Sequence, residues 1–448
     1  MFELQGKERH MKHSIHIYNF GPVGEAEIDL NKKLQVLIGE QASGKSTICK
    51  VVYFCQKIRD YTLEFLMDAE QYQNSHQNEY FNNYMKYLSR QFMGYFGKTT
   101  HMKKFRIVYL FGGNQIRITL NSDGYIRFVF DNNLKNGIYA LINDAAKMHM
   151  TDSIKDLYSS TFDRVAAMIM FKKDFRIRLN HFFSNENDIL YIPAGRSLLA
   201  TMPESLQDML ISEMDLTMQD FIRVIRIMKS SFGDRIPDIV KEYTKTVKGQ
   251  VNNDALDKAY RLIHQVLKAD YISDSDDEKI YFDEKHWVKL MYGSSGQQEV
   301  LWILMLIFKI ILESGKQFVI IEEPEAHLFP VAQKNVVELI ALLVRTTGSQ
   351  VIVTTHSPYV LTSLNVLLYS DKVENHGKGK KMGIIPANVR IDYGTFQAYR
   401  MNPADGSIVN LMDEETHMIQ TDYIDSVSTI TNEELEKLIE REVEDSEV

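Results

Sequence analysis

Continuous and alternating apolar segments divide the first part of the chain into predicted strands and helices. Residues 14–30 contain two short alternating segments around Gly21-Pro22, which predicts two strands joined by a turn. Residues 33–38 form an apolar run typical of a buried strand, and a helix is predicted over residues 45–58. The sequence then stays helical and aromatic in character to about residue 96.

A β-meander is predicted within this helical stretch. Over residues 105–130, three apolar-rich segments are separated by Gly112-Gly113 and by Ser122-Asp123-Gly124, which are turn-forming residues. Helical character returns over residues 134–183. We therefore expect residues 57–188 to form an insertion in which helices flank the meander.

The second half of the chain predicts a parallel sheet. A short strand at residues 189–192 and a helical region at 203–268 precede an acidic segment, 274–278, which is expected to be a solvated loop. Helix, strand, helix and strand then alternate, over residues 296–313, 318–322, 331–345 and 350–355. This alternation predicts an α/β fold with right-handed crossovers. A small β-rich C-terminal extension is expected over residues 385–431, followed by an acidic helical tail over 432–448.

Composition is that of a globular protein, because 44% of the 448 residues are hydrophobic and 25% are charged. The net charge of −9 differs from the basic balance of DNA-coating proteins, so any nucleic-acid contact is expected to be a local patch. Cys49 and Cys55 lie six apart in one predicted helix and should not pair. The longest apolar stretch, residues 300–311, is interrupted by Lys309. We therefore expect a buried helix there, no membrane association and a cytoplasmic protein.

Residues 39–47 match the P-loop pattern G-x-x-x-x-G-K-[ST], between the predicted buried strand and helix. The backbone N–H groups of such a loop wrap phosphate oxygens, and the helix N-terminus adds partial positive charge. Lys45 would reach the β- and γ-phosphates of ATP, and Ser46 would ligate Mg²⁺. The predicted nucleotide-binding residues are Gly39, Glu40, Gln41, Ala42, Ser43, Gly44, Lys45, Ser46 and Thr47.

Two later strands end in candidate catalytic side chains. Four apolar residues lead into Glu322 and Glu323, which places two carboxylates at the tip of a buried strand, where open α/β sheets bind ligands. Glu322 would hold Mg²⁺ through water, and Glu323 would polarise the attacking water. His356 follows the next strand and is placed to sense the γ-phosphate, although a structural histidine is the alternative.

A Ser-Gly pair before the long apolar helix is the fourth candidate. Ser295, Gly296 and Gln297 lie where a helix N-terminus could bind phosphate. The same segment fits an ordinary capping box, with Ser295 as the N-cap and Gln298 three residues later. Both interpretations can hold, because capping geometry exposes the N–H groups.

Together, these four motifs resemble those of the ABC-type ATPase heads, and most closely the SMC-related RecF and OLD (overcoming lysogenisation defect) branch. The matching segments are the opening strands, Walker A, the signature, Walker B with the D-loop, and the His switch, at residues 17–30, 39–47, 294–299, 322–330 and 354–358. The resemblance implies a P-loop NTPase domain over residues 14–384. It also implies a homodimer around two ATP molecules and two Mg²⁺ ions, with Ser295 and Gly296 acting in trans.

Residues 191–197, YIPAGRS, also resemble a stretch common in small ATPases of this branch. Its Arg196 is expected to face either the nucleotide or the partner subunit. The sequence after His356 departs from the OLD nucleases, because it shows no acidic pattern of a TOPRIM nuclease domain, so nuclease activity is not predicted. No region sustains the heptads of an SMC arm.

Three functions fit these motifs. The first is the ATPase sensor of a DNA-maintenance or anti-phage defence system, with a separate effector such as a nuclease. The second is a RecF-like repair ATPase that binds DNA, for which residues 171–178 and 223–229 offer basic clusters, although solvated helix faces are the favoured interpretation of both. A soluble ABC transporter subunit ranks last, because so long an insertion is unusual before its signature.

Overall fold

The computed structural model describes residues 13–73, 79–99, 101–102, 104–150, 161–247, 251–274, 277–376, 383–421 and 431–439. Its central element is a six-stranded sheet in the order β14-β13-β3-β12-β11-β7. The strands, in that order, are Ile408–Asn410, Phe396–Met401, Leu34–Ile38, Gln350–Thr355, Gln317–Glu322 and Asp188–Ile192. All neighbouring pairs are parallel except β13 with β14, which confirms the predicted α/β class.

A second, five-stranded sheet is antiparallel, in the order β2-β1-β4-β5-β6. Its strands, in that order, are Val23–Asp29, Ser14–Phe20, Arg106–Phe111, Asn114–Leu120 and Ile126–Phe130. The meander therefore continues the N-terminal hairpin, with Tyr18 opposite Arg106, and is not a separate unit of the insertion. The pairing joins residues almost 90 positions apart, which local sequence patterns do not record.

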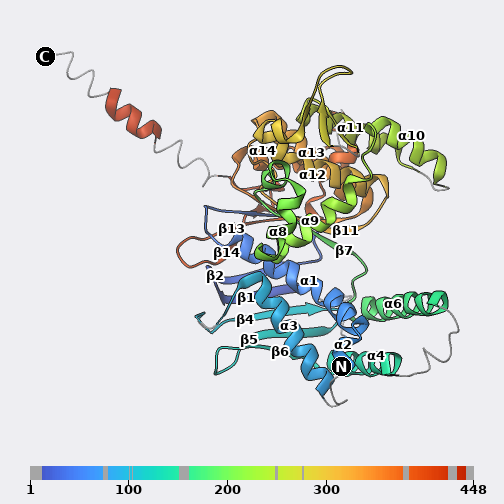
Figure 1. Cartoon of the computed structure of the whole chain (residues 1–448). Helices are drawn as coiled ribbons and strands as arrows, with labels where there is room; N and C mark the ends of the chain where they lie inside the picture. Colours follow the sequence, from blue (N-terminus) through green and yellow to red (C-terminus); the bar gives the residue numbers. More distant parts are fainter. Residues whose placement is uncertain are drawn as a thin grey trace, which may run out of the picture.

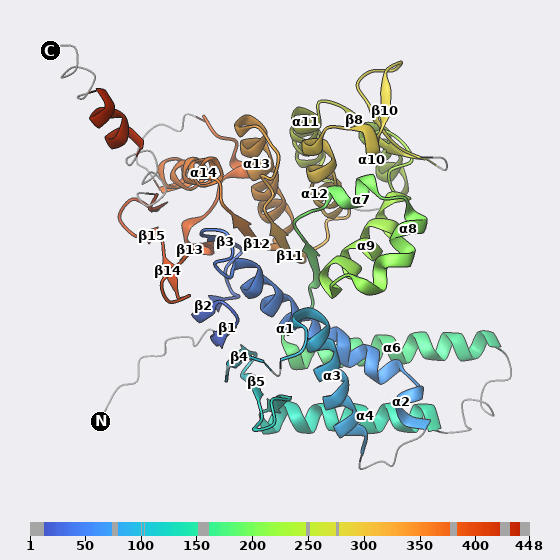
Figure 2. The same cartoon turned by 60° about the vertical axis from the view of Figure 1, so that its left-hand side comes forward.

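Helices separate and cover the two sheets (Figures 1 and 2). Helix α1, Lys45–Met67, lies between them, and its apolar residues share one core with both. Below it lie α2, α3, α4 and α6, which are Glu70–Gln73, Tyr80–Phe96, Asn132–Met150 and Thr161–Phe183. The other face of the central sheet packs against α12, α13 and α14, which are Ser295–Leu312, Pro330–Thr347 and Pro358–His376.

The region between β7 and α12 is only partly helical. It contains α7 to α11, which are Ser197–Thr201, Glu204–Leu210, Leu216–Lys229, Ile236–Thr246 and Asn253–Leu267. It also contains an unpredicted three-stranded sheet, β8 to β10, at Asp270–Ser273, Glu278–Tyr281 and Trp287–Lys289. Asp274 and Asp277, expected in a solvated loop, lie in the β8–β9 turn, and Lys279 forms an ion pair with Asp274.

The C-terminal segment is also more integrated than predicted. Strand β13 pairs in parallel with β3, so Phe396–Met401 belongs to the central sheet and not to a separate extension. The short strands β15 and β16, Met412–Asp413 and Met418–Ile419, pair with each other. Residues 431–439 form an exposed helix, whereas the rest of the predicted tail, from 440 on, lies outside the described residues.

Helix α12 is the single candidate, among the described helices, that is long and apolar enough to cross a membrane. Of its best window, 78% is buried inside the protein. It packs against α11 and α13 as part of the main core, so it is a core helix, as its sequence predicted.

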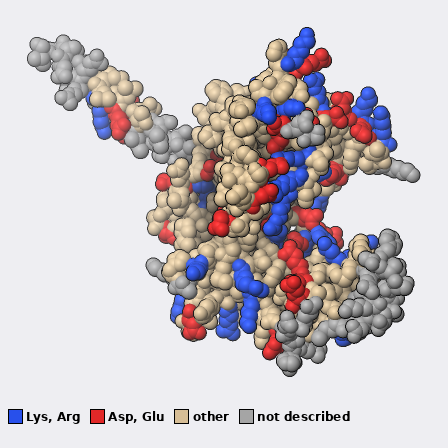
Figure 3. All heavy atoms as spheres, viewed as in Figure 1, with Lys and Arg blue, Asp and Glu red and all other residues tan. Residues whose placement is uncertain are grey.

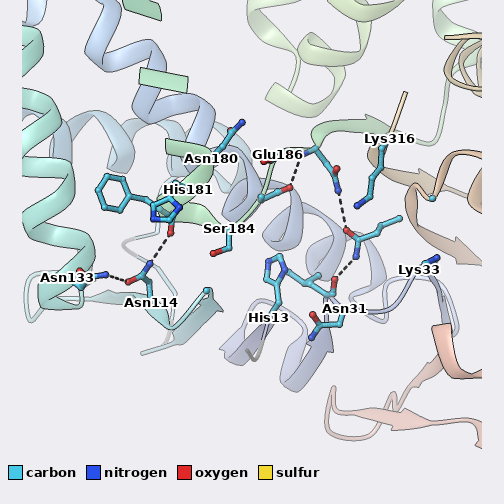
Figure 4. Close-up of a pocket in the computed structure, with 17 residues that line it drawn as sticks. His13, Asn31, Lys33, Asn114, Asn133, Asn180, His181, Ser184, Glu186 and Lys316 are labelled. Carbon is cyan, nitrogen blue, oxygen red and sulfur yellow. Dashed lines mark hydrogen bonds between the residues drawn. The ribbon is translucent and has the colours of Figure 1, made fainter. Parts of the chain in front are cut away.

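The amino ends of the central strands border a polar depression of about 1050 Å³ (Figure 4). Lys316, which precedes β11, and Gln350 from β12 line it on one side, and Asn114, Asn133 and Asn180 line it from the insertion. Two of its side-chain amides form hydrogen bonds within the protein. Asn133 donates to Asn114, which in turn donates to the carbonyl of Phe182. The P-loop lies at the opposite ends of the same strands.

Candidate functional site

The P-loop joins the fully buried strand β3 to α1. Its backbone departs from the usual regions at Ala42, with φ of 58°, and at Gly44, with φ of 105°. A Cβ on Gly44 would lie 3.1 Å from Val23 and 3.2 Å from Pro22, so both the conformation and the packing require glycine. Such a backbone turns consecutive N–H groups towards one point, which suits an anion.

Lys45 lies at the base of this loop. Its ammonium donates to the carbonyl oxygens of Gly39, at 2.9 Å, and Glu40, at 2.8 Å. Burial lowers the pKa of Lys45, while the nearby carboxylates, Glu323 foremost, act in the opposite direction. A charged lysine ammonium at this position can form charge-assisted hydrogen bonds with the phosphates of a nucleotide.

Glu322 ends strand β11 and is almost completely buried. One carboxylate oxygen accepts from the backbone N–H of Ala194 at 3.3 Å. The other, Oε1, has no hydrogen-bond partner among the described residues, which is costly for a buried carboxylate. This unsatisfied oxygen fits the proposed role of holding Mg²⁺ together with Ser46, because Mg²⁺ is usually bound by few protein oxygens plus phosphates and water.

Glu323 and His356 come from neighbouring strands and meet at this edge. Register pairs Glu322 with Thr354, which brings the ends of β11 and β12 side by side. The Glu323 backbone adopts a left-handed φ of 44°, and its N–H donates to the carbonyl of Thr354 at 3.0 Å. Its carboxylate oxygen then lies 3.0 Å from Nε2 of His356. The two predicted catalytic side chains are thus in direct contact.

Glu325 is a site residue that the sequence interpretation did not single out. Its Oε1 accepts from the hydroxyl of Thr355 and from the backbone N–H of His356, the latter at 2.8 Å. It therefore fixes the turn that carries the histidine. Its position in the EEPEAHLFP segment, two residues after Glu323, was the available signal.

Arg196 does not face solvent, contrary to the expectation that it would contact nucleotide or partner. Its side chain is fully buried and forms an ion pair with Glu299 at 3.3 Å. It also donates to the carbonyl oxygens of Glu322, at 2.6 Å, and Glu323, at 3.0 Å. Burial lowers the pKa of Arg196, partly offset by Glu299 and the other carboxylates. Arg196 thus holds the backbone under the two acidic residues.

The signature segment forms the first turn of α12, with the cap one residue earlier than predicted. Ser294 is the N-cap, and Gln297 completes the capping box. A Cβ on Gly296 would lie 2.8 Å from the carbonyl oxygen of His327, so Gly296 allows close contact with the D-loop. Within the described chain, no hydrogen bond or ion pair joins residues 294–297 to the P-loop residues 39–47.

The basic clusters suggested for DNA binding are paired with acids on α9 and in part on α6. Arg176 contacts Asp188, and Arg178 lies 2.8 Å from Asp144. On α9, the partners of Arg223, Arg226 and Lys229 are Asp220, Asp208, Glu204 and Glu278. These pairs compensate the charge of the α9 cluster and of the two arginines on α6, which favours a solvated face for them, whereas Lys172 and Lys173 have no ion pair within the described chain.

Comparison with known proteins agrees with this geometry. The family described as AAA ATPase domain matches residues 11–361. No curated protein matches the sequence.

Solved structures of SMC heads are weakly similar. They include an SMC head bound to the C-terminal winged-helix domain of ScpA (14% identity, 90% of this chain and 98% of that chain, TM-score 0.39). Another is the SMC head domain from Thermotoga maritima (11%, 90% and 100%, TM-score 0.34). A third is the Pyrococcus furiosus SMC head with an extended coiled coil, bound to the C-terminal domain of ScpA (13%, 90% and 96%, TM-score 0.37).

The family match spans residues 11–361, and within it the chain has a P-loop between a buried parallel strand and a helix. The chain belongs to the AAA ATPase domain family and is an ATPase.

Proposed function

We propose that this ATPase closes into a homodimer around two ATP molecules, with the signature of each copy completing the site of the other. The observation that carries the proposal is the separation of the two half-sites within one described chain. Around the P-loop, a Cβ on Gly39 would meet Met401 and Ser43, and a Cβ on Gly44 would meet Val23, Pro22 and Met401, none of which belongs to the signature. The N–H groups of Ser295 and Gly296 are then available to the γ-phosphate held by a second copy.

Exposed apolar side chains near these half-sites support a partner surface. Tyr292 precedes the signature, Phe329 and Val331 follow the D-loop, and Tyr359 follows His356. Their exposed fractions are 72%, 76%, 63% and 53% in that order. Large apolar groups exposed together beside a functional site are typical of an interaction surface.

Within each composite site, the roles follow the chemistry of the side chains. The P-loop backbone and Lys45 bind the phosphates, and Ser46 and Glu322 hold Mg²⁺, which would neutralise phosphate charge. Glu323 polarises the attacking water, and His356, at 3.0 Å from it, orients that carboxylate and senses the γ-phosphate. Catalysis by such a site is positioning and electrostatic stabilisation.

The biological role that we propose is an ATP-gated sensor in DNA maintenance or anti-phage defence. Closing with ATP and opening after hydrolysis would provide two states that a separate effector, such as a nuclease, could read. A RecF-like DNA-binding ATPase is the second reading, but the acid-paired clusters on α6 and α9 do not favour it.

Mixing two inactive variants tests the composite site. Lys45→Ala removes the P-loop lysine, and Gly296→Asp places a carboxylate at the signature. Each protein alone should be inactive, whereas the mixture should hydrolyse ATP, because the intact signature of the first completes the intact P-loop of the second. A mixture as inactive as both single variants, with heterodimers shown by differently tagged copies, would contradict sites shared between copies.

A further inference from the structure

An open pocket of about 670 Å³ lies between α3 and the edge strand β6. Its apolar lining includes Met85 and Met93 from α3, and Ile126 and Phe128 from β6. Met93 is 38% exposed, and Tyr125 beside it is 67% exposed. A pocket with an uncovered apolar lining on an edge strand favours an apolar occupant.

The rim of this pocket is cationic. Lys86, Arg90, Lys98 and Arg127 line it, and no aspartate or glutamate does so among the residues that the structure describes. None of these four has an ion pair or a side-chain hydrogen bond within the described chain, unlike the arginines of α6 and α9. Figure 3 shows Lys and Arg side chains gathered over α3 and β4–β6. In a chain of net charge −9, this local surplus selects for an acidic partner.

The same chain carries a segment of matching chemistry. In helix 431–439, Leu435, Leu438 and Ile439 are more than half exposed, and all nine residues are exposed. The spacing i, i+3, i+4 puts these three on one stripe. At 100° per residue, Glu434 and Glu436 flank the stripe on either side. The helix is thus apolar in the centre and acidic along both edges, whereas the pocket is apolar in its floor and basic at its rim.

We propose that the acidic helix 431–439 of a second copy docks in the pocket between α3 and β6. Lengths agree, because nine helical residues and the α3 span from Met85 to Met93 each extend over about 12–14 Å. Figures 1 and 2 both place the helix at the end of the molecule away from α3 and β6, which favours the pocket of another copy over its own. This contact uses neither the P-loop nor the signature, so it does not depend on the ATP-clamped dimer.

Charge pairs at an exposed rim stabilise weakly, so most of the affinity is expected from burial of the apolar stripe, while the rim charges select the partner. The contact would tie the C-terminal end of one copy to the N-terminal sheet of the other. In that arrangement the helix 431–439 is bound only when two copies associate, and it shields the basic rim from other acidic ligands.

Site-directed cross-linking of the full chain tests this proposal without ATP. Cys49 and Cys55 are buried, and burial raises the pKa of both thiols, so they should not react in the folded protein. One protein carries Met93→Cys and a second carries Leu438→Cys. Mixed and treated with a short bis-maleimide, they should give a cross-linked species of twice the chain mass that neither forms alone in comparable yield.

Charge reversal provides the specificity control. Lys86→Glu with Arg90→Glu in the Met93→Cys protein should reduce the yield at least about fivefold, whereas Lys104→Glu, exposed but outside the pocket, should not. Absence of a mixed cross-link would overturn the proposal. So would a cross-link found only inside one chain carrying both cysteines. If the rim reversal instead abolished oligonucleotide binding and left the cross-link unchanged, the rim would serve nucleic acid and the proposal would fail.

Discussion

The guanidinium of Arg196 forms an ion pair with the carboxylate of Glu299, 3.3 Å apart, and both side chains are almost completely buried. Glu299 also accepts from the N–H groups of Gly195, Arg196 and Ser197. Burial alone would raise the pKa of Glu299, but Arg196 and these N–H groups lower it overall. Through this pair, the first turn of α12, which carries the signature, is fastened to the backbone of Glu322 and Glu323.

Removing one member of this pair should destabilise the fold strongly. Arg196→Met leaves Glu299 buried without its partner, and such a change costs about 3–5 kcal/mol in free energy of unfolding. Arg223→Met is the matched control, because Arg223 is mostly exposed and its pair with Asp220 should contribute about 1 kcal/mol or less. Urea unfolding measures both. Equal effects of the two substitutions would contradict the structural role of Arg196.

The stability of the protein should depend on His13 at mildly acidic pH. Burial lowers the pKa of His13 to about 4, against the opposing effect of Asp29. Between pH 6.5 and about 4, the unfolded state therefore binds more protons than the folded state, so stability falls as the pH falls. The loss should reach roughly 3 kcal/mol at pH 4.

Urea unfolding from pH 7 to 4.5 tests this dependence. His13→Gln should flatten the slope of stability against pH, and His101→Gln, at an exposed position, should leave it unchanged. A His13→Gln protein with the original slope would show that another group causes the acid sensitivity.

Lys45→Ala should remove nucleotide binding. The substitution deletes a charged donor that the fold holds at 2.9 Å from the Gly39 carbonyl, at the base of the P-loop. Hydrogen bonds to charged groups are worth enough for a loss of affinity of roughly 10- to 100-fold or more. Titration with a fluorescent ATP analogue measures it, and Lys50→Ala, on the same helix but paired with Asp215, is the control. Unchanged affinity in Lys45→Ala would exclude residues 39–47 as the ATP site.

Gly296→Ala should reduce ATP hydrolysis while sparing ATP binding. The new Cβ would lie 2.8 Å from the His327 carbonyl, so the signature and the D-loop must move apart. A misplacement of about 1 Å in a catalytic arrangement lowers the rate by up to about 100-fold. Gly315→Ala meets no atom within 4 Å and is the control. A Gly296→Ala protein with normal turnover would show that this contact does not position the signature.

The nucleotide-binding motif was predictable from sequence because its residues are contiguous. Gly39 to Thr47 carry their own turn and helix start, so strand, loop and helix were predicted together. The acids of β11 and the histidine after β12 followed for the same reason. The 3.0 Å contact between Glu323 and His356 follows once β11 and β12 are neighbouring strands.

Features that depend on distant pairing were not predictable. Strand β13 joins β3 across more than 350 residues, and the meander joins β1, and neither pairing leaves a local pattern. Arg196 was expected to face the nucleotide or the partner subunit because residues 191–197 resemble a stretch of related ATPases, whereas its actual partner Glu299 lies about 100 residues away. The cap of α12 was misplaced by one residue because Ser294 and Ser295 are equally good caps, and only the Gln297 contact distinguishes them.

The most direct test of the central claim is the mass of Glu323→Gln with and without Mg·ATP, measured by mass photometry. This variant keeps the P-loop and the signature but lacks the carboxylate that we propose to polarise water, so it should bind ATP, stall and accumulate the closed dimer. The account predicts an ATP-dependent shift from the 52.0 kDa chain to twice that mass. A mass that does not change with ATP, or a Glu323→Gln enzyme that hydrolyses ATP at the normal rate, would contradict it.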